Sequence, residues 1–227
     1  MRMKNLLIGD VRFQFKYGFY FVYTIFTVIY ISLIYALPHS WRSNVATIMI
    51  LSDPAAMGLF FMGAIVLLEK SERVLNSIAV SPVGAEEYIL SKVISLSLIS
   101  TIVGLIIALA ADFNNLILVA FGISIGSAFF TLIGLIIASS IKSLNQFIVV
   151  TVPVEIICFL PPMFYLFGYK NTFMLIHPGC ILVRFISGNS DYLLILTFVL
   201  LIWVALIYLI AYKNIQMMFQ QTGGAKL

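Results

Sequence analysis

The sequence predicts an all-α polytopic membrane protein with six transmembrane helices and an N-terminal interfacial amphipathic helix. Of its 227 residues, 62% are hydrophobic and only 10% are charged, and the mean hydropathy is +1.11. A soluble domain carries about 25% charged residues, so this chain lacks the polar surface that a water-soluble globule needs. The apolar residues are also grouped in runs long enough to cross a bilayer. The bilayer is therefore the expected solvent for most of the chain.

A short helix at the membrane surface is expected before the first long apolar run. Several apolar side chains can share one side of a helix over residues 4–17, and the polar side chains Asp10, Arg12 and Lys16 lie between them. This pattern is typical of an amphipathic helix lying in the interface. The alternative is an ordinary basic flank of the first span. We assign residues 1–17 to this interfacial helix.

Six apolar runs follow, at about 18–37, 47–68, 89–111, 116–138, 146–168 and 192–212. Each provides about 20 mostly apolar residues, which is the length a spanning helix needs at 1.5 Å per residue. The runs lack the alternation of a membrane β-strand, so helices are predicted. Residues 18–212 form the expected transmembrane domain, and residues 213–227 form an expected cytoplasmic tail.

The basic residues predict the orientation of the spans. With the N-terminus inside, three basic residues flank the outer ends of the runs, and ten flank the inner ends: Arg2, Lys4, Arg12, Lys16, Lys70, Arg73, Lys92, Lys142, Lys213 and Lys226. The outer three are Arg42, Lys170 and Arg184. Such a bias places both termini in the cytoplasm of a multi-pass plasma membrane protein. The basic residues form no patch or arm, which argues against nucleic acid as a partner.

The charged segment from Glu69 to Lys92 is the longest inner connection. It holds a short amphipathic stretch at residues 74–80, which is broken by Ser81-Pro82 because proline cannot continue a helix interior. A short helix on the inner surface suits a docking site for a cytoplasmic partner. A solvated loop fits the same residues equally well.

This segment resembles the loop of the ABC-2-type permeases, which are membrane subunits of certain ATP-binding-cassette transporters. The resemblance rests on an acidic and a basic residue, a Ser-Pro pair 12 and 13 positions from the opening Glu, and a closing Tyr and Lys: Glu69, Lys70, Ser81, Pro82, Tyr88 and Lys92. Many family members carry Gly-Thr where this chain has Arg73-Val74. This variant is similar to the short drug-exporter permeases, such as the fluoroquinolone-type exporters.

The resemblance implies a homodimer or heterodimer of six-span subunits, each paired with a separate ATPase. ATP and Mg²⁺ would then belong to the ATPase, and this chain would bind no cofactor. In agreement, the sequence contains no G-x-x-x-x-G-K-[ST] phosphate loop. The ATPase-docking and coupling residues would be those of the loop: Glu69, Lys70, Glu72, Arg73, Ser81, Pro82, Tyr88 and Lys92.

Glu155 is an acidic residue placed well inside the fifth run. An ionised carboxylate at that depth is costly unless it is paired or hydrated. It could face a cavity or dimer seam and attract a cationic or zwitterionic substrate, or it could be a protonated carboxyl bonded to a neighbouring helix. Pro153, Pro161 and Pro162 share this helix and predict kinks. These kinks suit a substrate pathway or serve packing, and the outer half could be re-entrant.

Asp53-Pro54 interrupts the second run near its outer end. Asp53 is expected to cap a helix that begins there, with residues 46–52 lying at the surface. A substrate contact is the alternative role for this residue.

The fourth run carries Gly122, Gly126 and Gly134 on one side, which predicts close helix packing. The first two also belong to a G-x-S-x-G sequence around Ser124, which raises the alternative of a rhomboid-like intramembrane serine protease. Such an enzyme needs a base beside the serine, but His39 and His177 both lie in expected outer loops. Packing is therefore preferred, with no catalytic residue, and no His, Cys or Asp spacing suggests a metal site.

The function predicted from these observations is that of a membrane-spanning permease subunit, which exports a small amphipathic, drug-like molecule and is powered by a separate ATPase. The alternative from another class is an ATP-independent carrier or channel that uses Glu155 as a proton or ion site.

Overall fold

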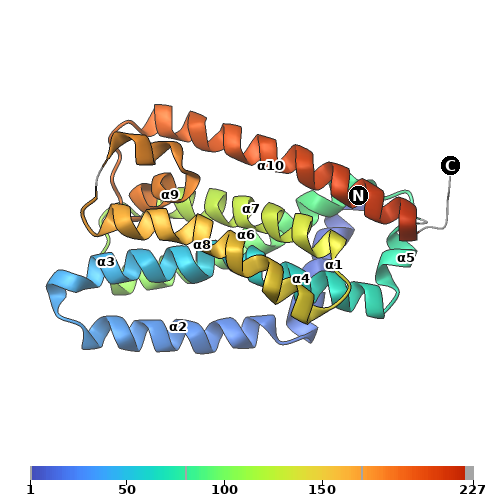
Figure 1. The fold of residues 1–227 in the computed structure, drawn as a ribbon. Helices are drawn as coiled ribbons and strands as arrows, with labels where there is room; N and C mark the ends of the chain where they lie inside the picture. The colour runs from blue at the N-terminus through green and yellow to red at the C-terminus, as the bar shows by residue number, and fades with distance from the viewer. Residues whose placement is uncertain (1, 80, 170, 223–227) are drawn as a thin grey trace.

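A computed structural model describes residues 2–79, 81–169 and 171–222, and within these ranges the chain contains helices and no β-strand. Six of the helical stretches are long and apolar enough to cross a membrane, which confirms the predicted fold class. They run side by side in an elongated bundle (Figure 1). Lys170 and Lys226, which the sequence places at the outer and inner flanks, lie outside the described residues, as do residues 223–227 of the expected tail.

In chain order the elements are α1 (Arg2–Lys16), α2 (Phe19–Ala36), α3 (His39–Ile50), the π-helical η1 (Leu51–Ala55), α4 (Met57–Ser71), α5 (Val74–Ala79), α6 (Ala85–Ala110), α7 (Leu116–Ser140), α8 (Leu144–Leu166), the 3₁₀ helix η2 (Thr172–Ile176), α9 (Pro178–Ile186) and α10 (Leu193–Thr222).

Three spans form the centre of the bundle and three lie at its edge. Half or more of the apolar window is buried in each central span, which are His39–Ser71, Ala85–Ala110 and Leu116–Ser140. The share falls to 22%, 22% and 11% in the edge spans Phe19–Ala36, Leu144–Leu166 and Leu193–Gln221. Exposed apolar side chains on α2, α8 and α10 suit contact with lipid.

The two ends of the bundle differ in what they carry (Figure 1). One end holds α1, α5 and the last turns of α10, and we call it the α1 end. The other end holds η2, α9 and the turns between α2 and α3 and between α6 and α7, and we call it the α9 end. The segment from Glu69 to Lys92 therefore lies at the same end as the start of α1 and the end of α10.

The second span corrects the prediction for Asp53. Asp53 does not cap a helix, because it lies inside η1, which joins α3 directly to α4. Residues 46–52 are not at the surface either, since Ala46, Ile50 and Leu51 are buried. Pro54 explains the interruption: proline lacks an N–H and collides with the carbonyl four residues earlier in an α-helix. A wider π turn accommodates it without ending the span.

The first helix exists where the sequence places it, but its polar residues are not all directed outward. Asp10 and Gln14 are 9% and 2% exposed, whereas Phe15 is 74% exposed. One side of α1 therefore packs its polar groups against the bundle, and α6 is the span that receives them.

The segment between the last two spans lies outside the six candidate membrane spans and is partly helical. It contains η2 and α9. Cys180, Ile181 and Leu182 of α9 are fully buried, so this short helix is inserted among α7, α8 and α10. The last span also continues as helix to Thr222, through most of the expected tail.

Candidate functional site

A group of buried polar side chains lies at the α1 end, and we call it the acid–lysine cluster: Asp10, Glu69, Tyr88, Ser91 and Lys92. Its members come from three elements, with Asp10 in α1, Glu69 near the end of α4 and the others in the first two turns of α6. The exposed fractions of Tyr88, Ser91 and Lys92 are 1%, 1% and 2%. The cluster thus joins three helices through side chains that water barely reaches.

Lys92 is the centre of the cluster. Its ammonium group donates hydrogen bonds to the carboxylates of both Asp10 and Glu69. It also lies 5.1 Å from the centroid of the Tyr88 ring, which adds a cation–π contact. A buried ammonium is tolerated only when it is paired and hydrogen-bonded, and two carboxylates meet that requirement.

The two carboxylates receive further hydrogen bonds from hydroxyl groups. Tyr88 Oη donates to Glu69 Oε2 at 2.6 Å, and Ser91 donates to Asp10. One turn deeper, Gln14 Nε2 donates to Ser95 Oγ at 3.0 Å. These bonds offset the desolvation of the carboxylates, because buried polar groups are stable when each has a partner. The contacts fasten α1 along the first turns of α6.

Lys70 connects α4 to the C-terminal end of α7. Its ammonium donates to the carbonyl oxygens of Ala138 and Ile141 at 3.3 and 3.0 Å, at the C-terminal end of α7. A cation suits this position, because the last carbonyls of a helix have no partner within the helix and carry partial negative charge. Lys70 therefore holds α4 to the turn that leads into α8.

The rest of the predicted docking segment is more exposed. Glu72 forms a surface ion pair with Lys16 at 3.8 Å, and Arg73 adopts a positive φ of 58° at the turn into α5. Ser81 Oγ donates to the carbonyl of Ile78 at 2.7 Å, which closes the turn after α5, and Pro82 is exposed. The segment thus divides into a buried part that joins helices and an exposed part that a partner could touch.

A groove of about 470 Å³ lies between α1 and the α5 segment. Asp10 and Glu69 belong to its lining, and most of the other lining residues are apolar, among them Leu6, Phe13, Val74, Ile78 and Val83. The acid–lysine cluster therefore borders a surface depression at the α1 end, directly beside the short helix α5.

The fifth span is one continuous helix, α8, although it contains three prolines. The outer half is therefore not re-entrant. Pro153 is exposed and Glu155 is half-buried, while Pro162 is buried. Glu155 lies on a span whose surface is mostly uncovered within a single chain. An acidic side chain on such a surface is costly beside lipid, so this face of α8 is a candidate for contact with another subunit or with cargo.

Pro161 and Pro162 lie where α8 packs against the start of α9, which favours the packing role among the two that the sequence allowed. Because proline has no N–H, they leave the carbonyls of Ile157 and Cys158 without helix partners. The His177 ring is hydrogen-bonded to the backbone of Ile157, and a Cβ on Gly179 would lie 2.7 Å from the Cys158 oxygen. Burial lowers the pKa of His177 below its usual value, so the ring is neutral at pH 7. The freed carbonyls are thus where the start of α9 meets α8.

Asp53 is a second acidic side chain inside a span. One of its carboxylate oxygens is buried without a hydrogen-bond partner among the described residues, and the side chain is hydrogen-bonded to Tyr30 of α2. The Tyr23 hydroxyl, also in α2, is buried and unpaired within the same ranges. An incompletely satisfied acid in a π-helical segment is a candidate ion or proton site, since such segments are frequent at functional sites.

Comparison with known proteins decides the family. The family model described as the fluoroquinolones export permease protein family matches residues 1–219 of the chain. The chain belongs to this family. It is therefore a multi-pass membrane permease, and its membership agrees with the ABC-2 resemblance of the Glu69–Lys92 segment.

Two curated relatives of the permease carry the same description. They are fluoroquinolones export permease proteins of Mycobacterium tuberculosis, from strains CDC 1551 / Oshkosh and ATCC 25618 / H37Rv. Each is 27% identical over 155 residues, a match that covers 66% of the permease and 65% of the relative.

The glycines Gly122, Gly126 and Gly134 of the fourth span lie at close contacts with neighbouring elements of this permease. A Cβ on Gly122 would lie 2.9 Å from Phe185 of α9, and one on Gly134 would lie 2.4 Å from the Gly58 oxygen of α4. A Cβ on Gly126 would lie 3.3 Å from Ala55. Each glycine therefore faces another element, which is the arrangement that small residues permit between membrane helices.

Ser124, the serine of the G-x-S-x-G sequence, is bonded to neighbouring helix groups. It donates to the Ala120 carbonyl at 2.8 Å, and its oxygen lies 2.8 Å from Thr101 Oγ1 of α6. His39 pairs with Asp112 at the α9 end, and His177 is bonded to Ile157. Among the described residues neither histidine is hydrogen-bonded to Ser124, so the geometry favours helix contact over a serine–histidine dyad.

The loop pattern in the sequence identifies Glu69, Tyr88 and Lys92, but it does not identify Asp10 of α1, which completes the buried cluster. A usable signal was present: Tyr88, Ser91, Lys92 and Ser95 are spaced i, i+3, i+4 and i+7 at the start of an apolar helix. This spacing places them on one side. Asp10 and Gln14 are likewise four residues apart in α1. Two polar stripes of this kind predict a buried contact between their helices.

Proposed function

We propose that this permease is the membrane subunit of an ATP-binding-cassette exporter of the ABC-2 type, and that it pairs with a second permease and with a separate ATPase chain. ATP and Mg²⁺ are bound by the ATPase, and this chain holds no cofactor. The cargo is a small amphipathic, drug-like molecule, for which the relatives' description makes a fluoroquinolone the first candidate. The observation that carries the proposal is a short helix, α5, which exposes Asn76 and Ser77 and borders the same groove as the acid–lysine cluster.

The exposed residues of the Glu69–Lys92 segment are the proposed docking surface. Arg73, Asn76, Ser77 and Pro82 are exposed on or beside α5. Glu69, Tyr88 and Lys92 are too buried to touch a docked chain. They are instead positioning residues, which hold the helices under α5 together.

Contacts beneath α5 support the transmission of movement into the spans. The helix packs against α4 and α10, and the cluster connects α4 to α6 and α1. Phe219 near the end of α10 also packs edge-on against Tyr88, with ring centroids 5.4 Å apart. A displacement of α5 by an ATPase would therefore reach four long helices at the α1 end, as rigid-body switching requires.

Glu155 and the exposed face of α8 are the proposed boundary of the cargo path between two permeases. The acid provides a site for a cationic or zwitterionic group, and the valine and isoleucine side chains around it suit an apolar cargo. Pro153 lies exposed two residues earlier on the same helix. Pro161 and Pro162 hold α9, and they shape the path only through this contact.

Affinity capture tests the docking proposal. A tagged permease should retain an ATPase with a phosphate-loop motif, identified by mass spectrometry and by ATP hydrolysis. Asn76→Glu combined with Ser77→Glu should reduce retention about tenfold, because it adds two charges to the docking surface. Asn114→Glu, exposed at the α9 end, is the matched control and should leave retention unchanged. Equal retention by the α5 double variant would refute docking at α5.

A proton- or ion-coupled carrier is the second candidate function, and Asp53 is the observation that favours it. Its unpaired buried oxygen beside two tyrosines could hold a proton or a cation. Under this function, a protonophore would stop export while ATP is present, and Asp53→Asn would abolish export. Under the ATPase-driven function, depletion of ATP would stop export at an unchanged proton gradient. The two treatments applied to the same cells distinguish the candidates.

A further inference from the structure

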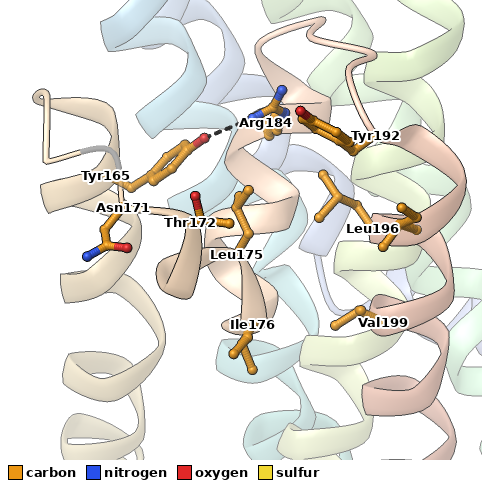
Figure 2. Close-up of a pocket in the computed structure, with 10 residues that line it drawn as sticks. Tyr165, Asn171, Thr172, Leu175, Ile176, Arg184, Tyr192, Leu196 and Val199 are labelled. Atoms are coloured by element: carbon orange, nitrogen blue, oxygen red, sulfur yellow. Dashed lines mark hydrogen bonds between the residues drawn. The ribbon is translucent and has the colours of Figure 1, made fainter.

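A second depression lies at the α9 end, far along the bundle from the acid–lysine cluster. Its volume is about 490 Å³, and it opens between the end of α8, η2 and the start of α10 (Figure 2). The residues that line it come from these elements, from the positions Asn171 and Tyr192 just before η2 and α10, and from α9, which supplies Arg184. Neither the docking proposal nor the α8 path uses this pocket.

Arg184 provides a buried positive charge at one end of the pocket. Its side chain is only 12% exposed. Nη1 donates to Tyr165 Oη at 3.2 Å, and Nη2 donates to Asn189 Oδ1 at 3.1 Å and to Asp191 Oδ2 at 2.9 Å. Nε is buried and has no partner among the described residues. Three of the five guanidinium N–H groups have these partners, so the group keeps donors, Nε–H among them, for a further acceptor.

Aromatic and apolar side chains complete the pocket. The Arg184 guanidinium lies 5.9 Å from the centroid of the Tyr192 ring. Figure 2 shows Arg184, Tyr165 and Tyr192 gathered at one level, with Leu175, Ile176 and Val199 further along the bundle. The pocket is thus charged and aromatic at the tip of the bundle and apolar toward its middle.

Asp191 occupies the position that a ligand carboxylate would take. It is 69% exposed and lies in the loop before α10, and its own N–H donates to Asn189 Oδ1 at 2.9 Å. An exposed carboxylate that bonds a buried arginine gains little net free energy, because water screens it. An external acid could therefore replace Asp191 on Nη2 and also engage the unpaired Nε, which makes a bidentate contact.

We propose that this pocket binds an anionic amphiphile, with its acidic group on Arg184 and its apolar body against Leu175, Ile176 and Val199. Asp191 acts as an internal competitor that leaves when the ligand enters. The acid is a carboxylate or a phosphate, and its source is a soluble aromatic acid or an anionic lipid. The site does not depend on the proposed ATPase, since it lies in this chain alone.

Binding to the purified permease, without any ATPase, tests the proposal. The soluble probe is 2-naphthoate, and its uncharged methyl ester is the matched control ligand. We expect the acid to bind at least about tenfold more tightly than the ester, because only the acid forms the charged contact. The lipid arm uses native mass spectrometry, with retention of phosphatidylglycerol compared with that of phosphatidylcholine.

Substitutions of Arg184 and of Asp191 should change the affinity for the acid in opposite directions. Arg184→Gln should lose the preference for the acid, whereas Asp191→Asn should strengthen binding by about three- to tenfold because the competitor is neutral. Asp112→Asn, which alters another exposed acid at the α9 end, should change nothing. If Arg184→Gln fails to fold, Asp191→Asn alone still decides, because that side chain is exposed.

Either source of the acid would support the proposal when it shows this dependence. Selective binding of 2-naphthoate would identify a site for soluble acids, and selective retention of phosphatidylglycerol would identify a lipid site. Equal binding of acid and ester with no preference for phosphatidylglycerol, or weaker binding after Asp191→Asn, would overturn it. Failure of ATPase capture would leave this result unaffected, so the two proposals fail separately.

Discussion

Lys92 is the residue on which the acid–lysine cluster depends, because among the described residues it is the cation that pairs with the buried carboxylates of both Asp10 and Glu69. Lys92→Met would leave two carboxylates buried without their cation. Removing one partner of a buried ion pair typically destabilises a protein by about 3–5 kcal/mol. For a chain of this size we expect the melting temperature in detergent to fall by roughly 6–20 °C, measured by scanning fluorimetry.

The control for this prediction neutralises the whole cluster. The triple variant Asp10→Asn, Glu69→Gln, Lys92→Met removes all three charges while keeping side-chain volumes similar. Its melting temperature should recover most of the loss, since replacement of a complete buried ion group is often nearly neutral. A single Lys92→Met variant that melts like the parent would show that the carboxylates are not held by this lysine.

Arg73 carries backbone strain that a different residue would relieve. Its φ of 58° lies in the left-handed region, which is about 1–2 kcal/mol unfavourable for residues other than glycine. Arg73→Gly should therefore raise the melting temperature by a few degrees, whereas the β-branched Arg73→Val should lower it. Gly18 tests the same strain in the opposite direction, because it is a glycine with a φ of 75°. Gly18→Val should be destabilising although no atom lies within 4 Å of the position that a Cβ would take. No difference between the two Arg73 variants would contradict the strain.

The residues of the cluster show why the site was only partly predictable from sequence. Glu69, Tyr88 and Lys92 stand out because they are polar residues beside apolar runs, and the loop pattern depends only on local spacing. Their burial depends on Asp10, which is 82 residues away from Lys92 in the chain. A contact between such distant residues cannot be read from one sequence unless both polar stripes are recognised and paired.

At the scale of the elements, α4 and α7 approach each other closely where they cross, because Gly58 and Gly134 carry no side chains there. A Cβ on Gly134 would lie 2.4 Å from the Gly58 backbone oxygen, and one on Gly58 would lie 1.9 Å from Thr131 Oγ1. Gly134→Ala must therefore push the helices apart. We expect a loss of about 1–3 kcal/mol, measured as a lower melting temperature.

Gly9 provides the matched control for this prediction. It also lies in a helix, but nothing lies within 4 Å of the position that a Cβ would take there. Gly9→Ala should be neutral or stabilise the helix by up to about 1 kcal/mol, because alanine loses less backbone entropy than glycine. Equal melting temperatures for the two alanine variants would mean that α4 and α7 do not meet at Gly134.

The spans themselves were predictable because they depend on composition within short windows. The six apolar runs required no knowledge of neighbouring helices, and all six became helices. The second span shows where this local reasoning fails. Asp53-Pro54 is a typical helix start in water, but in a membrane the backbone groups need partners, so the chain continues through a π turn. Similarly, Pro161 and Pro162 suggested kinks and a re-entrant outer half, whereas α8 is one continuous helix and the start of α9 meets the carbonyls that they free.

At the scale of the whole molecule, the uneven burial of the spans bears on assembly. Glu155 lies on α8, only 22% of whose apolar window is buried within the chain. If a second permease covers this face, cysteines there should cross-link. Ile148 and Val152 lie seven and three residues before Glu155 on the same side of the helix, and both side chains are exposed. The variants to test are therefore Ile148→Cys and Val152→Cys.

We expect each of these variants to form a cross-linked dimer in membranes treated with a short thiol-reactive linker, read as a doubled mass on a denaturing gel. Leu201→Cys in α10 is equally exposed and serves as the control, which should stay monomeric. Cys158 and Cys180 are buried, so the parent should give little background. Cross-linking at Leu201 but not on α8 would move the dimer seam to α10.

The orientation of the whole bundle is the last property that follows from the charge distribution. The α1 end carries most of the basic flanking residues, so it should face the cytoplasm. Ser77 on α5 and Asn114 between α6 and α7 are exposed at opposite ends of the bundle. In intact cells, a membrane-impermeant maleimide should label Asn114→Cys and leave Ser77→Cys unlabelled. Opening the membrane should make Ser77→Cys react as fully as Asn114→Cys. Labelling of Ser77→Cys from outside would place α5 beyond the reach of any cytoplasmic ATPase, and the proposed coupling through the acid–lysine cluster would fail with it.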